Sequence, residues 1–185
     1  MIIGVTGTDG AGKGAVVKYL IRSYSYVHYS SRSEIEREIS SRGLLSNRNN
    51  MRLVANSMRS EYGNDILVVR ALENIEENNE TDAIIESIRT IAEAETLRSR
   101  GGVLLAVDAD IKKRFNRIRG RGSSSDKVSF QEFKEQEALE MNDPDPNGMQ
   151  KAKVIEKADY VIYNNSTLRS LYRSVDDFLE STSIS

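Results

Sequence analysis

The sequence contains no cysteine and no tryptophan, and it has one histidine and two prolines among its 185 residues. Without cysteine the chain can form neither disulfides nor thiolate metal sites. A reducing cytosol is the simplest setting for such a chain, so we expect a cytoplasmic protein. The first residues form a short β-branched run, without the cationic region and long apolar stretch of a signal peptide. We expect no membrane as a partner.

Neither charge sign dominates, because 26 Lys and Arg face 28 Asp and Glu and the net charge is -2. This balance argues against general nucleic-acid binding, although local clusters count more than the total. The length suits one domain with a substantial core, and no repeat or low-complexity linker divides the chain. We therefore expect a single domain over residues 1–185, acting on small molecules as a monomer or homodimer.

The stretch MIIGVTGTDGAGKGA at residues 1–15 is the most informative part of the chain. A short apolar run precedes GTDGAGKG at residues 7–14, which matches the pattern G-x-x-x-x-G-K, and apolar residues then recur at helical spacing. A strand, a glycine loop and a helix form the context in which this motif binds phosphate. The alternative is a glycine turn with a surface lysine, but spacing and context both favour the phosphate loop.

The composition of this loop fits phosphate chemistry. Backbone N–H groups can wrap a phosphate where side chains are absent, and the following helix offers further N–H donors and a partial positive charge. We expect donor phosphates to bind along the whole loop, at Gly7, Thr8, Gly10, Ala11, Gly12, Lys13, Gly14 and Ala15. The charge of Lys13 can reach the terminal phosphates.

A second informative stretch is TDAIIESIR at residues 81–89, where a buried strand is predicted to end at Glu86. In a phosphate-loop fold, a carboxylate at this place faces the phosphates. It can hold the waters of Mg²⁺ or orient an acceptor hydroxyl. Arg89 can clamp an anionic substrate through two parallel hydrogen bonds. The alternative is an exposed carboxylate at a strand end followed by an ordinary helix arginine.

A cationic run, IKKRFNRIRGRG at residues 111–122, follows the predicted strand VLLAVDAD. Three apolar residues give this helix a packed face, so part of its charge is simply solvated. Arg117, Arg119 and Arg121 lie beside glycines and serines, where we expect a mobile segment. Without ligand these arginines should be exposed, and with ligand they should close over the transferring phosphate.

The remaining chain alternates between predicted strands and helices. His28 lies on a short strand at residues 26–30, where we expect a structural role. The pairs Ser33 with Glu36 and Ser129 with Glu132 have the spacing of capping boxes that open helices. This alternation predicts an α/β fold with a parallel sheet covered on both faces, and ligands at the carboxyl ends of the strands.

The chain resembles the P-loop nucleoside and nucleotide kinases, which include adenylate kinase, thymidylate kinase and dephospho-coenzyme A kinase, and nucleotide-kinase-like proteins near them. The resemblance spans nearly the whole chain and is carried by GTDGAGKG (7–14), IIESIR (84–89), LLAVDADIKKRFNRIRGRG (104–122), DKVSFQEF (126–133) and ADYVIYNN (158–165). The first motif is specific for the superfamily. The others indicate the subgroup without naming a substrate.

The resemblance implies a three-layer α/β/α P-loop NTPase fold with a five-stranded parallel sheet. It divides the chain into a core (about 1–31, 79–118 and 148–185), acceptor-binding helices (about 32–78) and a lid (about 119–147). The cofactors it implies are ATP and Mg²⁺. The catalytic set combines a loop lysine, two carboxylates and two lid arginines: Lys13, Asp9, Glu86, Arg117 and Arg121. Arg117 and Asn164 would bind the donor, and Asp9, Arg37 and Arg89 the acceptor.

Two positions depart from the family pattern. The hydroxyl residue that normally touches Mg²⁺ is replaced by Gly14 followed by Ala15, so we expect nucleotide oxygens and waters to hold the metal. Glu86 and Asp9 could reach it through water.

The second departure lies in the stretch that binds the acceptor in adenylate kinases. The arginine position there is occupied by Glu36, and Arg37 lies one step away, which is about 100° around a helix. The acceptor therefore stays open.

Three functions compete on this basis. The leading hypothesis is a phosphotransferase that moves the γ-phosphoryl group of ATP to a small nucleotide-like acceptor, such as a nucleoside monophosphate or a dephospho-coenzyme A-like molecule. The second is a non-catalytic nucleotide-binding sensor or regulatory module, which the two departures make tenable. The third is a kinase that acts on nucleic-acid ends, suggested by the cationic run alone, although we do not expect nucleic acid as a partner.

Overall fold

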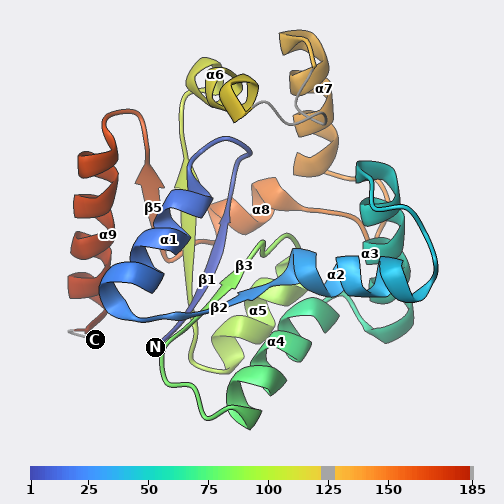
Figure 1. The fold of residues 1–185 in the computed structure, drawn as a ribbon, viewed down its shortest axis with the longest axis horizontal. Helices are drawn as coiled ribbons and strands as arrows, with labels where there is room; N and C mark the ends of the chain where they lie inside the picture. Colours follow the sequence, from blue (N-terminus) through green and yellow to red (C-terminus); the bar gives the residue numbers. More distant parts are fainter. Residues whose placement is uncertain (122–127, 184–185) are drawn as a thin grey trace.

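The computed structural model describes residues 1–121 and 128–183, with the backbone alone for Arg48, Arg121 and Ser183. Its core is a parallel sheet of five strands (Figure 1): β1 Ile2–Gly7, β2 Val27–Ser30, β3 Ala83–Glu86, β4 Val103–Asp108 and β5 Tyr160–Tyr163. The strand order is β2-β3-β1-β4-β5. The strand order reverses beside β1, which is where ligands bind in open α/β sheets.

Helices connect the strands in the order that the sequence predicts. Within the described chain they are α1 Lys13–Tyr24, α2 Ser31–Ser41, α3 Arg48–Tyr62, α4 Ile66–Glu77, α5 Ile91–Ser99, α6 Ile111–Arg121, α7 Phe130–Met141, α8 Lys151–Glu156 and α9 Leu168–Ser183. None of the helices in the described part of the chain is both long and apolar enough to cross a membrane.

Helices cover both faces of the sheet. On one face, α1 and α9 bury Val17 and Phe178 against Ile84. On the other, α4, α5 and α8 bury side chains such as Leu97 against Ile85. Adjacent strand residues point to opposite faces, so Ile84 and Ile85 enter different cores. The predicted three-layer α/β/α fold with a five-stranded parallel sheet is confirmed.

Two further groups of helices surround the carboxyl edge of the sheet. The helices α2, α3 and α4 form a small core of their own, built around Ile39, Met58 and Leu67. At the edge where β1 and β4 end, α6 and α7 lie beyond the sheet (Figure 1). The division into acceptor-binding helices and a lid remains a prediction.

One of the two predicted capping boxes is present. Ser129 Oγ accepts from the N–H of Glu132 at 3.2 Å, and the N–H of Ser129 donates to the Glu132 carboxylate at 2.6 Å. The box predicted at Ser33 is wrong, because α2 begins two residues earlier, directly where β2 ends. Glu36 lies within the helix and accepts from Arg32 Nε at 2.8 Å.

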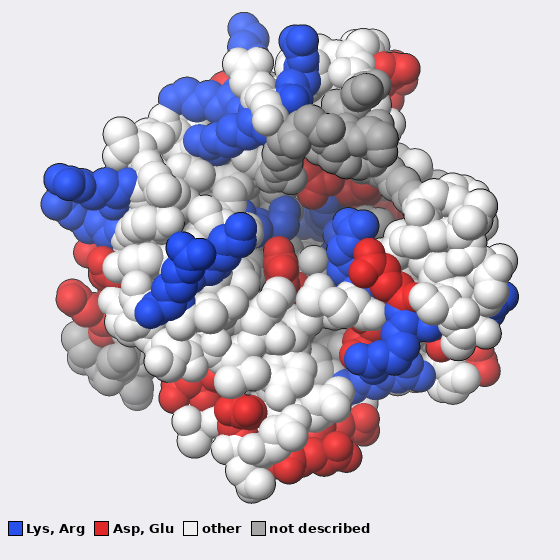
Figure 2. Space-filling model, viewed as in Figure 1, with Lys and Arg blue, Asp and Glu red and all other residues white. Residues whose placement is uncertain are grey.

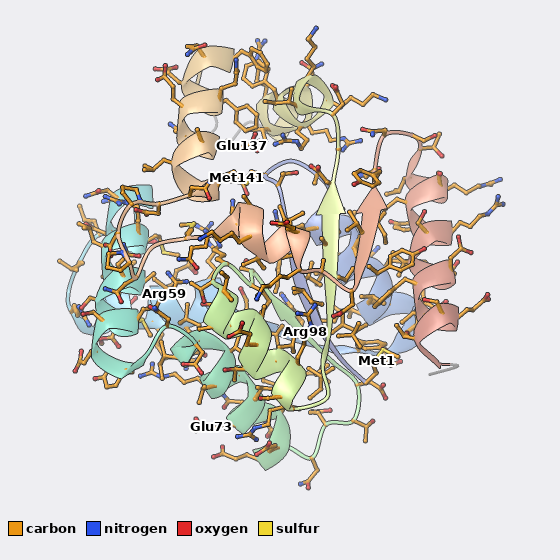
Figure 3. All side chains as sticks on the ribbon, turned by 180° about the vertical axis from the view of Figure 1, so that it is seen from behind. Met1, Arg59, Glu73, Arg98, Glu137 and Met141 are labelled. Atoms are coloured by element: carbon orange, nitrogen blue, oxygen red, sulfur yellow. The ribbon has the colours of Figure 1, made fainter. Side chains whose placement is uncertain are left out.

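A fully buried ion pair joins α3 to α5, and its arginine, Arg59, is labelled in Figure 3. Arg59 Nη2 lies 3.0 Å from Glu93 Oε1, and the two side chains are 1% and 0% exposed. The second oxygen of Glu93 accepts from the N–H groups of Arg89 at 2.6 Å and Thr90 at 3.1 Å. This carboxylate therefore fixes both the start of α5 and the backbone at Arg89.

We predict that Arg59→Met lowers the free energy of unfolding by about 3–5 kcal/mol, because it leaves the buried Glu93 charge uncompensated. The double variant Arg59→Met/Glu93→Gln should recover a large part of the loss. Urea denaturation measures both. Arg100→Met is the control, since it breaks an exposed pair with Glu76 and should cost at most about 1 kcal/mol. A double variant as unstable as Arg59→Met alone would contradict the prediction.

Candidate phosphate-binding site at the carboxyl edge of the sheet

The glycine loop follows β1 along a path that excludes side chains. Gly7 and Gly12 have φ angles of 127° and 110°, which L-residues rarely adopt. A β carbon at Gly7 would lie 2.0 Å from the carbonyl oxygen of Val107, and one at Gly12 would lie 2.5 Å from Asn164 Nδ2. The sequence needs glycine at these positions because the loop packs directly on the neighbouring strand and on the loop after β5.

Two side chains hold the carbonyl groups of the loop. Asn164 Nδ2 donates to the carbonyl oxygen of Ala11 at 2.7 Å. The Arg117 guanidinium lies 3.4 and 3.3 Å from the carbonyl oxygens of Gly10 and Ala11, and it also donates to the Asn164 carbonyl at 2.8 Å. Asn164 is therefore buried behind the loop, where its side chain supports the backbone.

The N–H groups at the start of α1 lack such partners. In residues 1–121 and 128–183, the N–H groups of Gly12, Lys13 and Gly14 donate to no protein acceptor. The first N–H groups of a helix have no partner within it, and together with the helix dipole they attract anions. The loop thus presents free donors at the place where the motif predicts phosphate.

Lys13 lies across the loop with its ammonium turned back onto the backbone. Its Nζ donates to the carbonyl oxygens of Gly7 at 2.9 Å and Thr8 at 2.8 Å. Burial lowers the pKa of Lys13 from 10.5 to about 8, opposed by the charge of Asp9 and reinforced by the positive charge of Lys151. A phosphate group would supply the full counter-charge that this ammonium lacks.

Asp9 lies between two ammonium groups. Its Oδ1 is 3.1 Å from Lys151 Nζ and 3.6 Å from Lys13 Nζ. Burial favours a raised pKa for Asp9, but the charges of Lys151, Lys13 and Arg89 outweigh it and hold the pKa well below the usual range. Asp9 is therefore a carboxylate at neutral pH. Lys151, which starts α8, was not expected at the site.

A second group of charges anchors the loop to α6 and α7. Thr8 Oγ1 donates to Asp108 Oδ1 at 2.6 Å, at the end of β4. The buried Arg114 donates to the carbonyl oxygen of Asp9 at 3.2 Å, and its guanidinium also pairs with Glu137 of α7, whose side chain points toward α6 (Figure 3). Neither Asp108 nor Arg114 was expected at the site, although Asp108 occupies a strand end as Glu86 does.

Glu86 lies at the end of β3, as predicted, and makes contact with the single histidine. Its Oε2 is 3.0 Å from His28 Nε2, and this hydrogen bond is the largest of the effects that lower the pKa of Glu86. His28 thus contacts a candidate site residue. The next residue, Ser87, has a φ of 78°, a strained backbone geometry that turns the chain from β3 toward Arg89.

The Arg89 guanidinium has a weak partner. In the described chain its side chain makes one hydrogen bond, 3.2 Å long, to the thioether sulfur of Met149. A guanidinium carries five N–H donors, whereas a thioether is a poor acceptor. Arg89 is half-buried, and its charge acts on both Asp9 and Lys13. Its position suits an anion that would replace the thioether contact.

Figure 2 shows charged side chains of both signs gathered in a recess near the centre of the molecular face. The recess lies in front of the edge where β1 and β3 end in Figure 1. Opposite charges in close proximity fit the short contacts of Asp9 with Lys13 and Lys151. The candidate site is thus lined by charges of both signs.

The structure does not bring every expected residue to the site. Arg37 is exposed and donates to Glu34 on its own helix at 3.0 Å, so it does not contact the loop. Arg119 is exposed and lies over the Phe115 ring at 5.8 Å. The side chain of Arg121 lies outside the described residues. The expectation that Arg117 is exposed without ligand is wrong, because the loop carbonyls hold it.

The described residues fit Mg²⁺ only if nucleotide oxygens and waters supply most of its ligands. Nothing lies within 4 Å of a β carbon built at Gly14, so the absent hydroxyl leaves open space. No cluster of three or more acidic or histidine ligands occurs among the described residues. Asp9 and Glu86 are carboxylates at the same edge and could bind metal-bound water. Mg²⁺ readily keeps several waters, so such a site is chemically consistent.

We predict that ATP affinity falls as the pH rises through about 8, by at most about tenfold per pH unit, because the protonated Lys13 binds phosphate and its pKa in the free protein is about 8. Calorimetric titrations between about pH 7 and pH 9.5 measure this. Lys13→Arg is the control, since a guanidinium keeps its charge throughout this range. An equal decline in both proteins would contradict the assignment to Lys13.

Sequence comparisons place the chain among known families. A model of the AAA domain matches residues 3–142. The UPF0200 protein of Thermococcus sibiricus is 30% identical over 186 residues, which cover 97% of this chain and 94% of that protein.

Solved structures share the fold at lower identity. The protein TT1252 from Thermus thermophilus superposes with a TM-score of 0.67 at 21% identity, covering 98% of this chain and 97% of its own. A shikimate kinase from Bacteroides thetaiotaomicron superposes with a TM-score of 0.64 at 15% identity, covering 97% and 98%. These likenesses show a P-loop kinase-like fold. The sequence matches alone establish that the chain belongs to the AAA domain family and to the UPF0200 proteins.

Proposed function

We propose that this protein is an ATP-dependent phosphotransferase that moves the γ-phosphoryl group to a small nucleotide-like acceptor. The acceptor would be a nucleoside monophosphate or a dephospho-coenzyme A-like molecule. The observation that carries the proposal is the half-buried Arg89 guanidinium beside the phosphate loop, with a thioether as its hydrogen-bond acceptor in the described chain. A second anion-binding group next to a donor loop is what a transfer enzyme needs and a simple nucleotide-binding module does not.

The donor side rests on the loop and the start of α1. Free N–H groups at Gly12, Lys13 and Gly14 would bind the phosphates, and the Lys13 ammonium would exchange loop carbonyls for phosphate oxygens. Mg²⁺, when bound, supplies charge neutralisation on the β- and γ-phosphates.

The acceptor side rests on Arg89 and the two carboxylates. Arg89 would bind the acceptor phosphate through two parallel hydrogen bonds. Glu86 or Asp9 would orient the nucleophilic oxygen of the acceptor. This oxygen forms the new bond to the γ-phosphorus while the bond from that phosphorus to the leaving oxygen of ADP breaks, and an acceptor hydroxyl passes its proton to the carboxylate that orients it. Arg117, released from the loop carbonyls, would stabilise the charge on the transferring group, since catalysis of this reaction is mostly positioning and electrostatics.

The two alternative functions have less support. A sensor module would bind nucleotide without transfer, and the missing hydroxyl at Gly14 is compatible with it. A kinase for nucleic-acid ends rested on the cationic run, but two of its arginines face inward. Arg114 is 5% exposed and pairs with Glu137, and Arg117 holds the loop. The run therefore offers less surface charge than its sequence indicates.

We predict that wild-type protein forms ADP from ATP in the presence of a nucleoside monophosphate or a dephospho-coenzyme A-like acceptor. Arg89→Met should raise the acceptor KM about 10- to 100-fold, because it removes charge-assisted hydrogen bonds worth about 1.5–3 kcal/mol. ATP affinity should change far less. A coupled assay of ADP formation over an acceptor panel measures the effect.

The control for Arg89 is Arg98→Met, which removes an arginine from α5 that pairs with Asp159 at 2.8 Å on the surface. Its acceptor KM should remain within about twofold of wild type, as expected for a surface ion pair. ATP binding without acceptor-dependent ADP formation over the whole panel would contradict the transferase and favour the sensor.

A further inference from the structure

Two open grooves adjoin each other where α1 and α9 lie side by side on the sheet (Figure 1). Their volumes are about 480 and about 440 Å³, and they share three lining residues, Tyr19, Leu168 and Tyr172. The second groove also reaches Gly14 and Ala15 at the start of α1. Together they form one continuous surface, the tyrosine groove, which leads away from the phosphate loop along α1 and α9.

A stacked pair of aromatic rings lies in the middle of the tyrosine groove. The ring centroids of Tyr19 and Tyr172 are 4.2 Å apart, and the ring planes are inclined by 7°. The hydroxyl groups of Tyr19 and Tyr24 donate to Asp176 Oδ1 at 2.8 and 2.7 Å, so the Tyr19 ring is held in place. Tyr172 is half-buried and Leu168 is 54% exposed. Aromatic and apolar surface therefore remains open to a ligand.

Positive charge lines both sides of the tyrosine groove, and Figure 2 shows Lys and Arg side chains over both α1 and α9. Each helix contributes two cations four residues apart, a spacing that puts them on one face of the helix: Lys18 and Arg22 on α1, and Arg169 and Arg173 on α9. All four are exposed, and within residues 1–121 and 128–183 none of their side chains has an acidic or hydrogen-bonding partner. Asp176 is the one carboxylate among the described lining residues, and tyrosine hydroxyls hold it.

These features match the chemistry of single-stranded nucleic acid. Unpaired cations attract its phosphates, and aromatic side chains offer faces on which its unpaired bases stack. Two cations on each of two helices suit a ligand with several phosphates better than one with a single phosphate. An acidic peptide would use the cations but not the stacked tyrosines. The net charge of -2 does not oppose such a ligand, because local charge decides where a polyanion binds.

We propose that the tyrosine groove binds single-stranded nucleic acid, with phosphates along its four cations and a base stacked on Tyr172. The groove lies on the face of the sheet that α1 and α9 cover, whereas the backbone of Arg89 is tied to α5 on the other face. The bound strand is therefore not the acceptor of the proposed transfer reaction. This binding activity goes beyond that reaction and does not depend on it.

The first experiment measures the fluorescence anisotropy of a labelled single-stranded oligonucleotide of about 12 nucleotides between about 50 and 200 mM salt. Arg22→Met/Arg173→Met removes one cation from each helix. The slope of log affinity against log salt should become shallower by about 1.4, because each lost phosphate contact removes about 0.7. Arg98→Met/Arg100→Met is the matched control, since it removes two arginines at the end of α5 and changes the net charge equally. An equal change in both double variants would overturn the proposal.

The second experiment tests the stacked base. Tyr172→Leu should bind the same oligonucleotide about 5- to 150-fold more weakly, the range expected for the loss of one stacked base. Tyr172→Phe keeps the ring and should bind as wild type does. Circular dichroism verifies that both variants are folded. Wild-type affinity in Tyr172→Leu would overturn the role of the ring and with it the proposal.

Competition separates nucleic acid from other ligands. The labelled strand should stay bound in the presence of excess ATP with Mg²⁺, and an oligoglutamate peptide of equal charge should displace it poorly. Displacement by ATP would place the strand in the phosphate loop, and displacement by the peptide would assign the groove to an acidic protein. Either result, or no binding of the strand at the lower salt concentration, would overturn the proposal and leave the proposed phosphotransferase untouched.

Discussion

The close approach of the loop to β4 is the constraint on which the site depends. At Gly7 the backbone passes so near to the carbonyl group of Val107 that a β carbon would lie 2.0 Å from its oxygen. Because the loop packs on β4, it turns tightly enough for α1 to begin at Lys13, and the first N–H groups of that helix point to the carboxyl edge of the sheet. Asn164 and Arg117 donate hydrogen bonds to carbonyl oxygens of the loop. In the described chain the N–H groups at the start of α1 therefore stay free to bind phosphate.

Around this loop, buried cations are matched with protein acceptors. Arg114 pairs with Glu137 and Lys151 with Glu140, so two carboxylates of α7 balance charge beside the loop. The resemblance assigns α7 to a lid, and movement of α7 would have to break both ion pairs. Arg89 is the exception among these cations, since a thioether is its partner in the described chain. In the described chain the positive charge of Arg89 therefore lacks a strong hydrogen-bond acceptor, and an anionic acceptor molecule would supply one.

The sequence predicted features with local signals and missed those that depend on tertiary packing. The glycine loop, the strand that ends at Glu86 and the capping box at Ser129 each have a motif of a few residues, and all three are present. Lys151 has no such signal, because its burial results from the packing of α7 and α8 at the loop, and the nearby Lys153 is exposed. The contact of His28 with Glu86 needs the pairing of β2 with β3. The failed box at Ser33 shows that the end of a strand can decide where a helix begins. Asp108 also ends a predicted buried strand, so the rule that identified Glu86, a carboxylate at a strand end, would have identified it too.

The central claim is that the loop and Lys13 bind the phosphates of ATP. The most direct measurement is a calorimetric titration of ATP with Mg²⁺ into wild type and into Lys13→Ala, with circular dichroism to verify that both are folded. The account predicts one binding site in wild type and an affinity at least about tenfold lower in Lys13→Ala, because a charge-assisted phosphate contact worth about 1.5–3 kcal/mol is lost. Wild-type affinity in a folded Lys13→Ala protein would contradict it.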